Sequence, residues 1–190
     1  QQNDERGHRY QRFTDHSSHG FFNATRPDIG EELWSSTGTP ATTSVLELNP
    51  GPGSSFVSTG IALNGAFVFS RFVNASASLW RTDGTPAGTL AINPDLGVFG
   101  TFARMGSDAI FGGGGPQGGS FSNVEPWKTN GTSAGTLQVA DLKPGFQSSS
   151  PSSLASFRGQ AAFIATDLAY SVWITDGTSA GTKRITSRLC

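Results

Sequence analysis

Short apolar runs alternate with polar, glycine-containing breaks along most of the chain. The segment 154–165 holds two such runs joined at Gly159, and the same arrangement recurs in segments 61–69 and 102–111. Runs of this length, bounded by turn residues, predict strand pairs rather than helices. The Asn64-Gly65 dipeptide supports this, because both central residues of a type I′ hairpin turn need positive φ. The pattern therefore predicts antiparallel β-hairpins.

A repeated segment contains all four tryptophans, Trp34, Trp80, Trp127 and Trp173, which are spaced 46, 47 and 46 residues apart. In the last three copies the tryptophan is followed by Thr-Asx-Gly-Thr and then by Ala-Gly-Thr, so that a glycine recurs at Gly84, Gly131 and Gly177. The first copy departs, with Ser36, Thr37 and Thr42 in place of Thr, Asx and Gly. A period of this length is typical of β-arrays and propellers.

Each period has room for four strands. The third strand carries the tryptophan, and the fourth follows the Gly-Thr pair, at 44–48, 90–92, 137–142 and 183–186. The links between periods, such as 49–55 and 143–151, are rich in proline, glycine and serine and too short for a crossover helix, so neighbouring units must lie side by side. We predict an all-β fold of four tandem four-stranded antiparallel units of about 46 residues, arranged as a four-bladed β-propeller, with a linear β-repeat stack as the alternative. The units span 9–48, 56–96, 98–142 and 153–190, and a polar N-terminal tail (1–12) precedes a single repeat domain (13–190).

The repeated segment resembles a bacterial tandem-repeat family whose consensus is Glu-Leu-Trp-x-Thr-Asp-Gly-Thr-x-Ala-Gly-Thr. The resemblance covers residues 20–190, and at least eight positions agree in three copies. It implies propeller-like β-repeats in large secreted or surface proteins, and it implies no single activity.

Composition narrows the classes of partner. Thirteen basic and 14 acidic side chains leave a net charge of −1, so no surplus of positive charge exists to bind nucleic acid. No stretch reaches the 18 apolar residues of a membrane-spanning helix, so we expect no membrane insertion. The single cysteine, Cys190, cannot form a disulfide within the chain and is expected to stay a free thiol or to cross-link subunits.

Candidate chemistry is sparse. The three histidines, His8, His16 and His19, lie in the non-repeating N-terminal segment and are interpreted as solvated rather than metal-binding. Asp83, Asn130 and Asp176 could form a ring of calcium ligands, but an Asx side chain before glycine more often stabilises its own turn. The tryptophans could stack on sugar rings, although one residue type at one place in every unit favours a core contact against the next unit. The glycine-rich tract 112–119 is interpreted as a flexible loop. No cofactor is predicted.

The functional prediction is a non-enzymatic extracellular or cell-surface protein with a structural or adhesive role. Three sequons, Asn23, Asn74 and Asn130, are weak support for secretion and glycosylation. We expect self-association into an oligomer or filament through the tail, with Tyr10 and Phe13 as apolar anchors on a neighbour's strand edge; the alternative is a tail that folds back along its own unit. A lectin-like module that binds a glycan or another ligand is the second functional class.

Overall fold

The computed structural model describes residues 2–3, 9–16, 19–73, 76–117 and 120–186, and the side chains of residues 19–73, 76–115 and 123–186. These residues form four antiparallel sheets, which we call the first to fourth blades. The first blade comprises β1 (Gln2–Asn3), β2 (Arg9–His16), β3 (His19–Arg26), β4 (Gly30–Ser36) and β5 (Ser44–Leu46), with a short 3-10 turn η1 (Pro40–Thr42). The second comprises β6 (Val57–Leu63), β7 (Ala66–Val73), β8 (Ser76–Thr82) and β9 (Leu90–Asn93). The third comprises β10 (Gly97–Met105), β11 (Asp108–Gln117), β12 (Ser120–Thr129) and β13 (Leu137–Gln138), and the fourth β14 (Ser152–Phe157), β15 (Gln160–Thr166), β16 (Tyr170–Thr175) and β17 (Lys183–Arg184).

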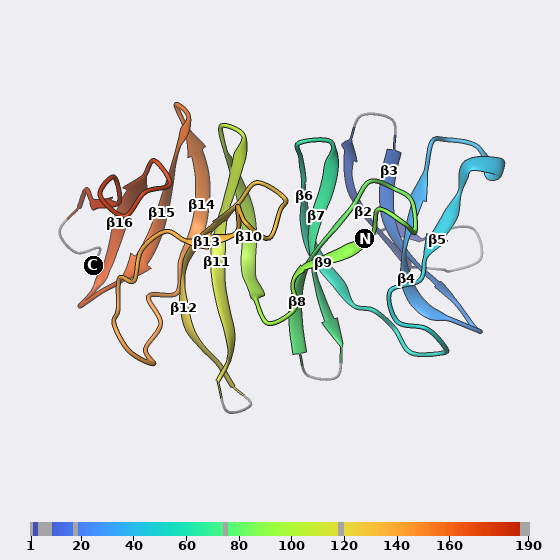
Figure 1. Cartoon of the computed structure of the whole chain (residues 1–190), viewed down its shortest axis with the longest axis horizontal. Coiled ribbons are helices and arrows are strands. Elements are labelled where there is room, and N and C mark those ends of the chain that lie inside the picture. The colour runs from blue at the N-terminus through green and yellow to red at the C-terminus, as the bar shows by residue number, and fades with distance from the viewer. Residues whose placement is uncertain (1, 4–8, 17–18, 74–75, 118–119, 187–190) are drawn as a thin grey trace.

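The predicted fold class is confirmed: the four predicted units correspond to four antiparallel sheets, and the first sheet has β1 as an additional fifth strand. The hairpin turn at Asn64-Gly65 is also confirmed, with φ of 48° and 80°. The innermost strands β2, β6, β10 and β14 lie next to one another in sequence order. Figure 1 shows the four blades in a row along the long axis, with the first and fourth at opposite ends.

Three apolar clusters fill the spaces between neighbouring blades. Phe21 and Leu33 of the first blade meet Phe67 and Phe69 of the second. The Phe21 and Phe67 rings stack across the two blades with centroids 4.8 Å apart, and Phe67 stacks on Phe69 of its own blade at 5.5 Å. The next two clusters repeat the arrangement; their buried members are Leu63, Val68, Leu79, Ile92, Leu96, Ala109 and Phe111, and then Ala103, Met105, Ile110, Ala161, Phe163 and Ala165. The core of this protein therefore lies between sheets and not within one.

The tryptophans belong to these inter-blade clusters. Trp80, Trp127 and Trp173 are each partly buried and pack against the cluster that their blade shares with the preceding blade. The prediction of a repeated contact between blades therefore agrees with the structure, but the contact is with the preceding blade and not with the next. Trp34, in the first blade, is also half-buried, and its indole Nε1 donates to the Ala24 carbonyl over 3.2 Å.

The prediction of a flexible loop at 112–119 is wrong for its described part. Residues 112–117 lie in β11 and pair with β12. Glycine is needed there because of space: a Cβ on Gly113 would lie 2.7 Å from the Trp127 ring, and one on Gly112 would lie 3.1 Å from the Pro151 carbonyl oxygen. The tract is glycine-rich because a tryptophan and the link to the next blade lie against the strand. Gly118 and Gly119 lie outside the described residues.

The N-terminal segment adds to its own blade. Gln2 and Asn3 pair antiparallel with Tyr10 and Arg9 of β2, so β1 extends the first sheet to five strands. This is the alternative in which the tail folds back along its own unit.

Candidate functional site

The repeated turn after each tryptophan strand has the same geometry in three blades. In the second blade, Asp83 Oδ1 accepts from the backbone N–H and the hydroxyl of Thr85, over 2.9 Å and 2.7 Å. The Thr85 hydroxyl oxygen in turn accepts from the Gly88 N–H, and the Thr82 and Thr89 hydroxyls lie 2.6 Å apart. Asn130 and Asp176 make the same pairs of bonds to Thr132 and Thr178.

Glycine is required twice in each turn. A Cβ on Gly88, Gly135 or Gly181 would lie within about 2.1 Å of the Asx side chain. Gly84, Gly131 and Gly177 have φ of 96°, 86° and 87°, in the left-handed region. A Cβ on these three would meet His19, Val68 and Met105, all on the preceding blade. Each turn is therefore closed internally and packed against its neighbour.

This geometry explains the repeated Asx residues without a ligand. The hydrogen bonds from Thr85 and Thr178 lower the pKa of the Asp83 and Asp176 carboxyls, so each carboxylate is held by its own turn. Among the residues that the structure describes, no group of three or more His, Cys, Asp or Glu side chains is placed to hold a metal ion.

The turn in the first blade has only some of these hydrogen bonds. Ser36 replaces the threonine before the turn, and its hydroxyl lies 2.7 Å from that of Thr43. Thr37 has no side-chain carbonyl oxygen to accept these hydrogen bonds. The short turn η1 forms the bend instead, with the Thr42 N–H donating to the Thr39 carbonyl. The departure in sequence is therefore a local change of turn type.

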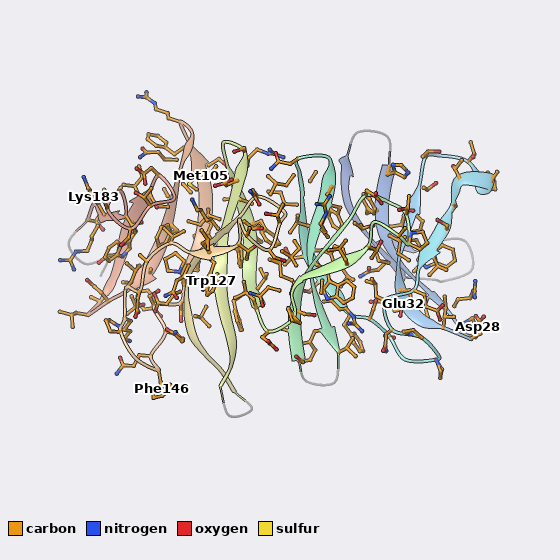
Figure 2. All side chains as sticks on the ribbon, viewed as in Figure 1. Asp28, Glu32, Met105, Trp127, Phe146 and Lys183 are labelled. Carbon is orange, nitrogen blue, oxygen red and sulfur yellow. The ribbon has the colours of Figure 1, made fainter. Side chains whose placement is uncertain are left out.

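Two fully buried glutamates have a structural role that the sequence analysis did not predict. Glu125, two residues before Trp127, accepts from the N–H of Leu142 and the N–H and hydroxyl of Ser149, over 2.9, 2.9 and 2.6 Å. Glu32, two residues before Trp34, accepts from the Leu48 N–H over 2.8 Å. Burial raises the pKa of both carboxyls, although their hydrogen bonds oppose the shift. Figure 2 labels Glu32 within the first blade.

These glutamates hold the links between blades. Glu32 holds the start of the long link between β5 and β6, and Glu125 holds both ends of the link between β13 and β14. In the second blade the equivalent residue is Ser78, and the link from β9 to β10 is only residues 94–96. In the sequence, a glutamate two residues before the tryptophan occurs in the blades that are followed by a long link, and serine occurs in the blade that is followed by a short one. This correlation could have predicted the structural role of the glutamates.

The asparagines of the three sequons differ in burial and in hydrogen bonding. Asn23 is buried and its Nδ2 donates to the Val57 carbonyl over 2.8 Å, so its prediction as a glycosylation site is wrong for the folded chain. Asn130 is half-buried, and its Oδ1 serves the turn. Asn74 lies outside the described residues.

The remaining predicted residues are only partly described. His19 is half-buried and stacks near Phe21 with centroids 6.3 Å apart. His16, Tyr10 and Phe13 lie in β2, where only the backbone is described, while His8 and Cys190 lie outside the described residues. None of these positions tests the assembly prediction.

Two surface features remain after these roles are assigned. A groove of about 390 Å³ between the second and third blades is lined mainly by aromatic and aliphatic side chains: Phe56, Phe72, Ala77, Val98 and Phe99, with Ser58 and Ser70. The fourth blade carries four of the nine exposed large apolar residues found among the described side chains: Phe157, Leu168, Tyr170 and Ile185.

The blade geometry has counterparts among solved structures. A puromycin hydrolase superposes with a TM-score of 0.59 at 15% identity, over 90% of this chain and 27% of that one. A puromycin-hydrolyzing peptidase from Mycobacterium tuberculosis gives 0.60 at 12% identity, over 91% of this chain and 28% of that one. The fold is that of β-propeller blades. At this identity the likeness concerns the fold alone, and the chain spans little more than a quarter of either protein.

The chain matches no family model and no curated protein sequence. Within the described residues, no helix has the length and apolar character needed to cross a membrane.

Proposed function

We propose that this chain is a non-enzymatic module of propeller blades that associates with other copies of itself, in an extracellular structural or adhesive role. The observation that carries the proposal is the concentration of exposed large apolar side chains on the fourth blade. Phe157 stands at the turn between β14 and β15, and Leu168 and Tyr170 stand at the opposite end of β15. Exposed apolar side chains that gather on one unit of a folded protein, and are not scattered singly over its surface, favour an interaction there. Leu168, at 94% exposure, and Tyr170 stand at the turn that begins β16.

The roles of the repeated polar residues support a scaffold rather than a reaction centre. The Asp83 and Asp176 carboxylates accept hydrogen bonds from the threonines of their own turns, and the buried glutamates hold the links between blades. The resemblance to the secreted repeat family supports an extracellular setting. A free Cys190 would be available there to cross-link assembled subunits.

The tail offers a second route to assembly. The pairing of Gln2 and Asn3 with β2 leaves the outer edge of β1 as a strand edge, to which a neighbour's chain could add through backbone hydrogen bonds. Tyr10 and Phe13 of the neighbour's tail would be the apolar anchors on that edge. A chain lacking residues 1–8 has no β1 but keeps all of β2. Under this route, light scattering should show a smaller assembly for the truncated chain than for the intact one at the same concentration, with unchanged β-sheet circular dichroism.

Size-exclusion chromatography with light scattering tests the proposal. We expect a mass above the 19.9 kDa of one chain, rising with protein concentration. A mass of one chain at every concentration up to the millimolar range would contradict self-association.

The groove supports a second candidate, a lectin-like module. Phe56 is 56% exposed and Phe72 contributes a second ring, while Ser58 and Ser70 supply hydroxyls. Aromatic faces beside hydroxyl groups can stack on and hydrogen-bond a sugar. A glycan array with the intact chain and a Phe56→Ser variant would decide this: binding lost in the variant supports the lectin function, and no binding by either excludes it for the glycans printed.

A further inference from the structure

We propose that the fourth blade docks onto the first blade of a second copy, head to tail, and thereby repeats between chains the contact that the chain makes three times within itself. This inference rests on the proposed self-association and names its surfaces. We call the side of a blade that contacts the next blade its forward face, and the side that contacts the preceding blade its rear face.

The hairpin turns give the first line of support. Leu63, Met105 and Phe157 occupy one structural position, the last paired residue before the first turn of their blades. Leu63 and Met105 are buried in inter-blade clusters, whereas Phe157 is 50% exposed. The fourth blade thus carries a large aromatic side chain where the second and third blades bury a core residue.

The outer strands give the second. Leu46, Ile92, Val139 and Ile185 occupy one position, immediately after the residue that pairs with the tryptophan. The first three are buried, and Ile185 is 57% exposed. The fourth blade therefore has an isoleucine at the same position of its forward face, and this isoleucine is exposed.

The residue after each tryptophan makes the last forward face more apolar than the others. Ser35 donates to the Gly84 carbonyl of the next blade over 2.9 Å, and Arg81 approaches the Gly131 carbonyl at 3.4 Å. Lys128 lies beside Gly177. The fourth blade has Ile174 at this place, so its forward face gains an apolar side chain where the internal contacts have a polar one.

The first blade has the complementary rear face. Phe69, Phe111 and Phe163, which pair with the tryptophans of their blades, are buried against the preceding blade, while the equivalent Phe22 is only half-buried. A Cβ on Gly38 would have nothing within 4 Å, although the equivalent Gly84, Gly131 and Gly177 all contact a preceding blade. The Phe22 ring and the space beside the turn at Gly38 are therefore both accessible on the rear face of the first blade.

These two faces differ, and they lie at opposite ends of the row in Figure 1. A contact between them is heterologous, so each chain retains one unused face after pairing. Copies then extend into a filament or close into a ring if the rotation allows. Burial of Phe157, Ile185 and Ile174 against Phe22 and Trp34 reproduces the chemistry of the three internal clusters.

Blocked variants test this interface. The double variant Phe157→Asp, Ile185→Asp blocks the forward face of the fourth blade, and both aspartates replace exposed side chains. The variant Ala24→Arg blocks the rear face of the first blade beside Phe22, at a half-buried position. Each change alone should weaken self-association by about 30-fold or more, as for a charge placed in an interface centre. Leu137→Asp, at 51% exposure on β13, is the matched control and should leave assembly unchanged.

The decisive sample is a mixture of the two blocked variants. Each variant alone should sediment at the mass of one chain, and an equimolar mixture should give a mixed pair, because one intact forward face meets one intact rear face. If each blocked variant assembles as well as the unmodified chain does, this interface is overturned but self-association stands. An Ala24→Arg variant that still pairs with itself, while the forward-blocked one does not, would mean that two fourth blades pair and would overturn the head-to-tail contact. An unmodified chain that never assembles would refute both proposals.

Discussion

Replacing Glu125 by alanine tests whether buried carboxylates hold the links between blades. The side chain is fully buried and accepts from two backbone N–H groups, those of Leu142 and Ser149, and from the Ser149 hydroxyl. The hydroxyl already lies 3.4 Å from the Val124 carbonyl oxygen and can turn to it. The two amides have no such alternative.

The magnitude follows from those two amides. A buried donor left without an acceptor costs about 1–3 kcal/mol, so the variant should lose about 3 kcal/mol in free energy of unfolding. For a chain of this size that corresponds to a midpoint lowered by about 6–12 °C. Ser171→Ala is the matched control: it is the equivalent position of the fourth blade, and its hydroxyl makes one long bond, 3.4 Å, to the Ala169 carbonyl. We expect a loss of about 1 kcal/mol or less there.

Urea unfolding monitored by tryptophan fluorescence measures both variants at neutral pH. Equal losses for Glu125→Ala and Ser171→Ala would refute the assignment of the glutamate to the link. A change in the slope of free energy against urea would indicate instead that the fourth blade unfolds separately.

Three further outcomes are expected. Trp127→Ala should lower the free energy of unfolding by about 3 kcal/mol, the low end for large aromatics because the ring is half-buried, and an unchanged stability with loss of ligand binding would favour the lectin function. Gly113→Val should destabilise by about 2 kcal/mol or more, because its Cβ would overlap the Trp127 ring, and the double variant Gly113→Val, Trp127→Ala should recover part of that loss, which a merely conformational effect of valine would not allow. Burial raises the folded-state pKa of Glu32 and Glu125 above the ordinary 4.5, so the free energy of unfolding should decrease as pH rises from 4.5 through the folded-state pKa. Urea titrations at several pH values measure this dependence, and a Glu32→Gln, Glu125→Gln variant should lack it.

The repeat made most of the fold predictable. One tryptophan per period identifies the four units, and the Asx-Gly turns indicate the register in three of them, since a turn type dictates which residues pair beside it. The Asp83 turn could also be predicted, because its hydrogen bonds are local.

Features that depend on a neighbouring blade could not be predicted in this way. The Asn23 sequon carries no information on burial, and Asn23 is buried because its amide meets the Val57 carbonyl of the second blade. Glycine propensity favours a loop at 112–117, but the segment pairs with β12 as a strand, and the Trp127 ring leaves no room for a side chain on Gly113. The buried Glu125 contradicts the usual exposure of glutamate, and only the link folded over it supplies its partners. The bare forward face of the fourth blade is visible only by comparison with its three structural equivalents.

Hydroxyl-radical footprinting of the intact chain at low and high concentration tests the central claim most directly, because it reports the solvent exposure of individual side chains. We predict that oxidation of Phe157 and Ile185, and of Phe22 and Trp34 at the other end, falls as concentration rises, while Leu137 is oxidised equally in both samples. Equal oxidation of Phe157 and Ile185 at both concentrations, in a sample shown to assemble, would contradict association through the blade faces.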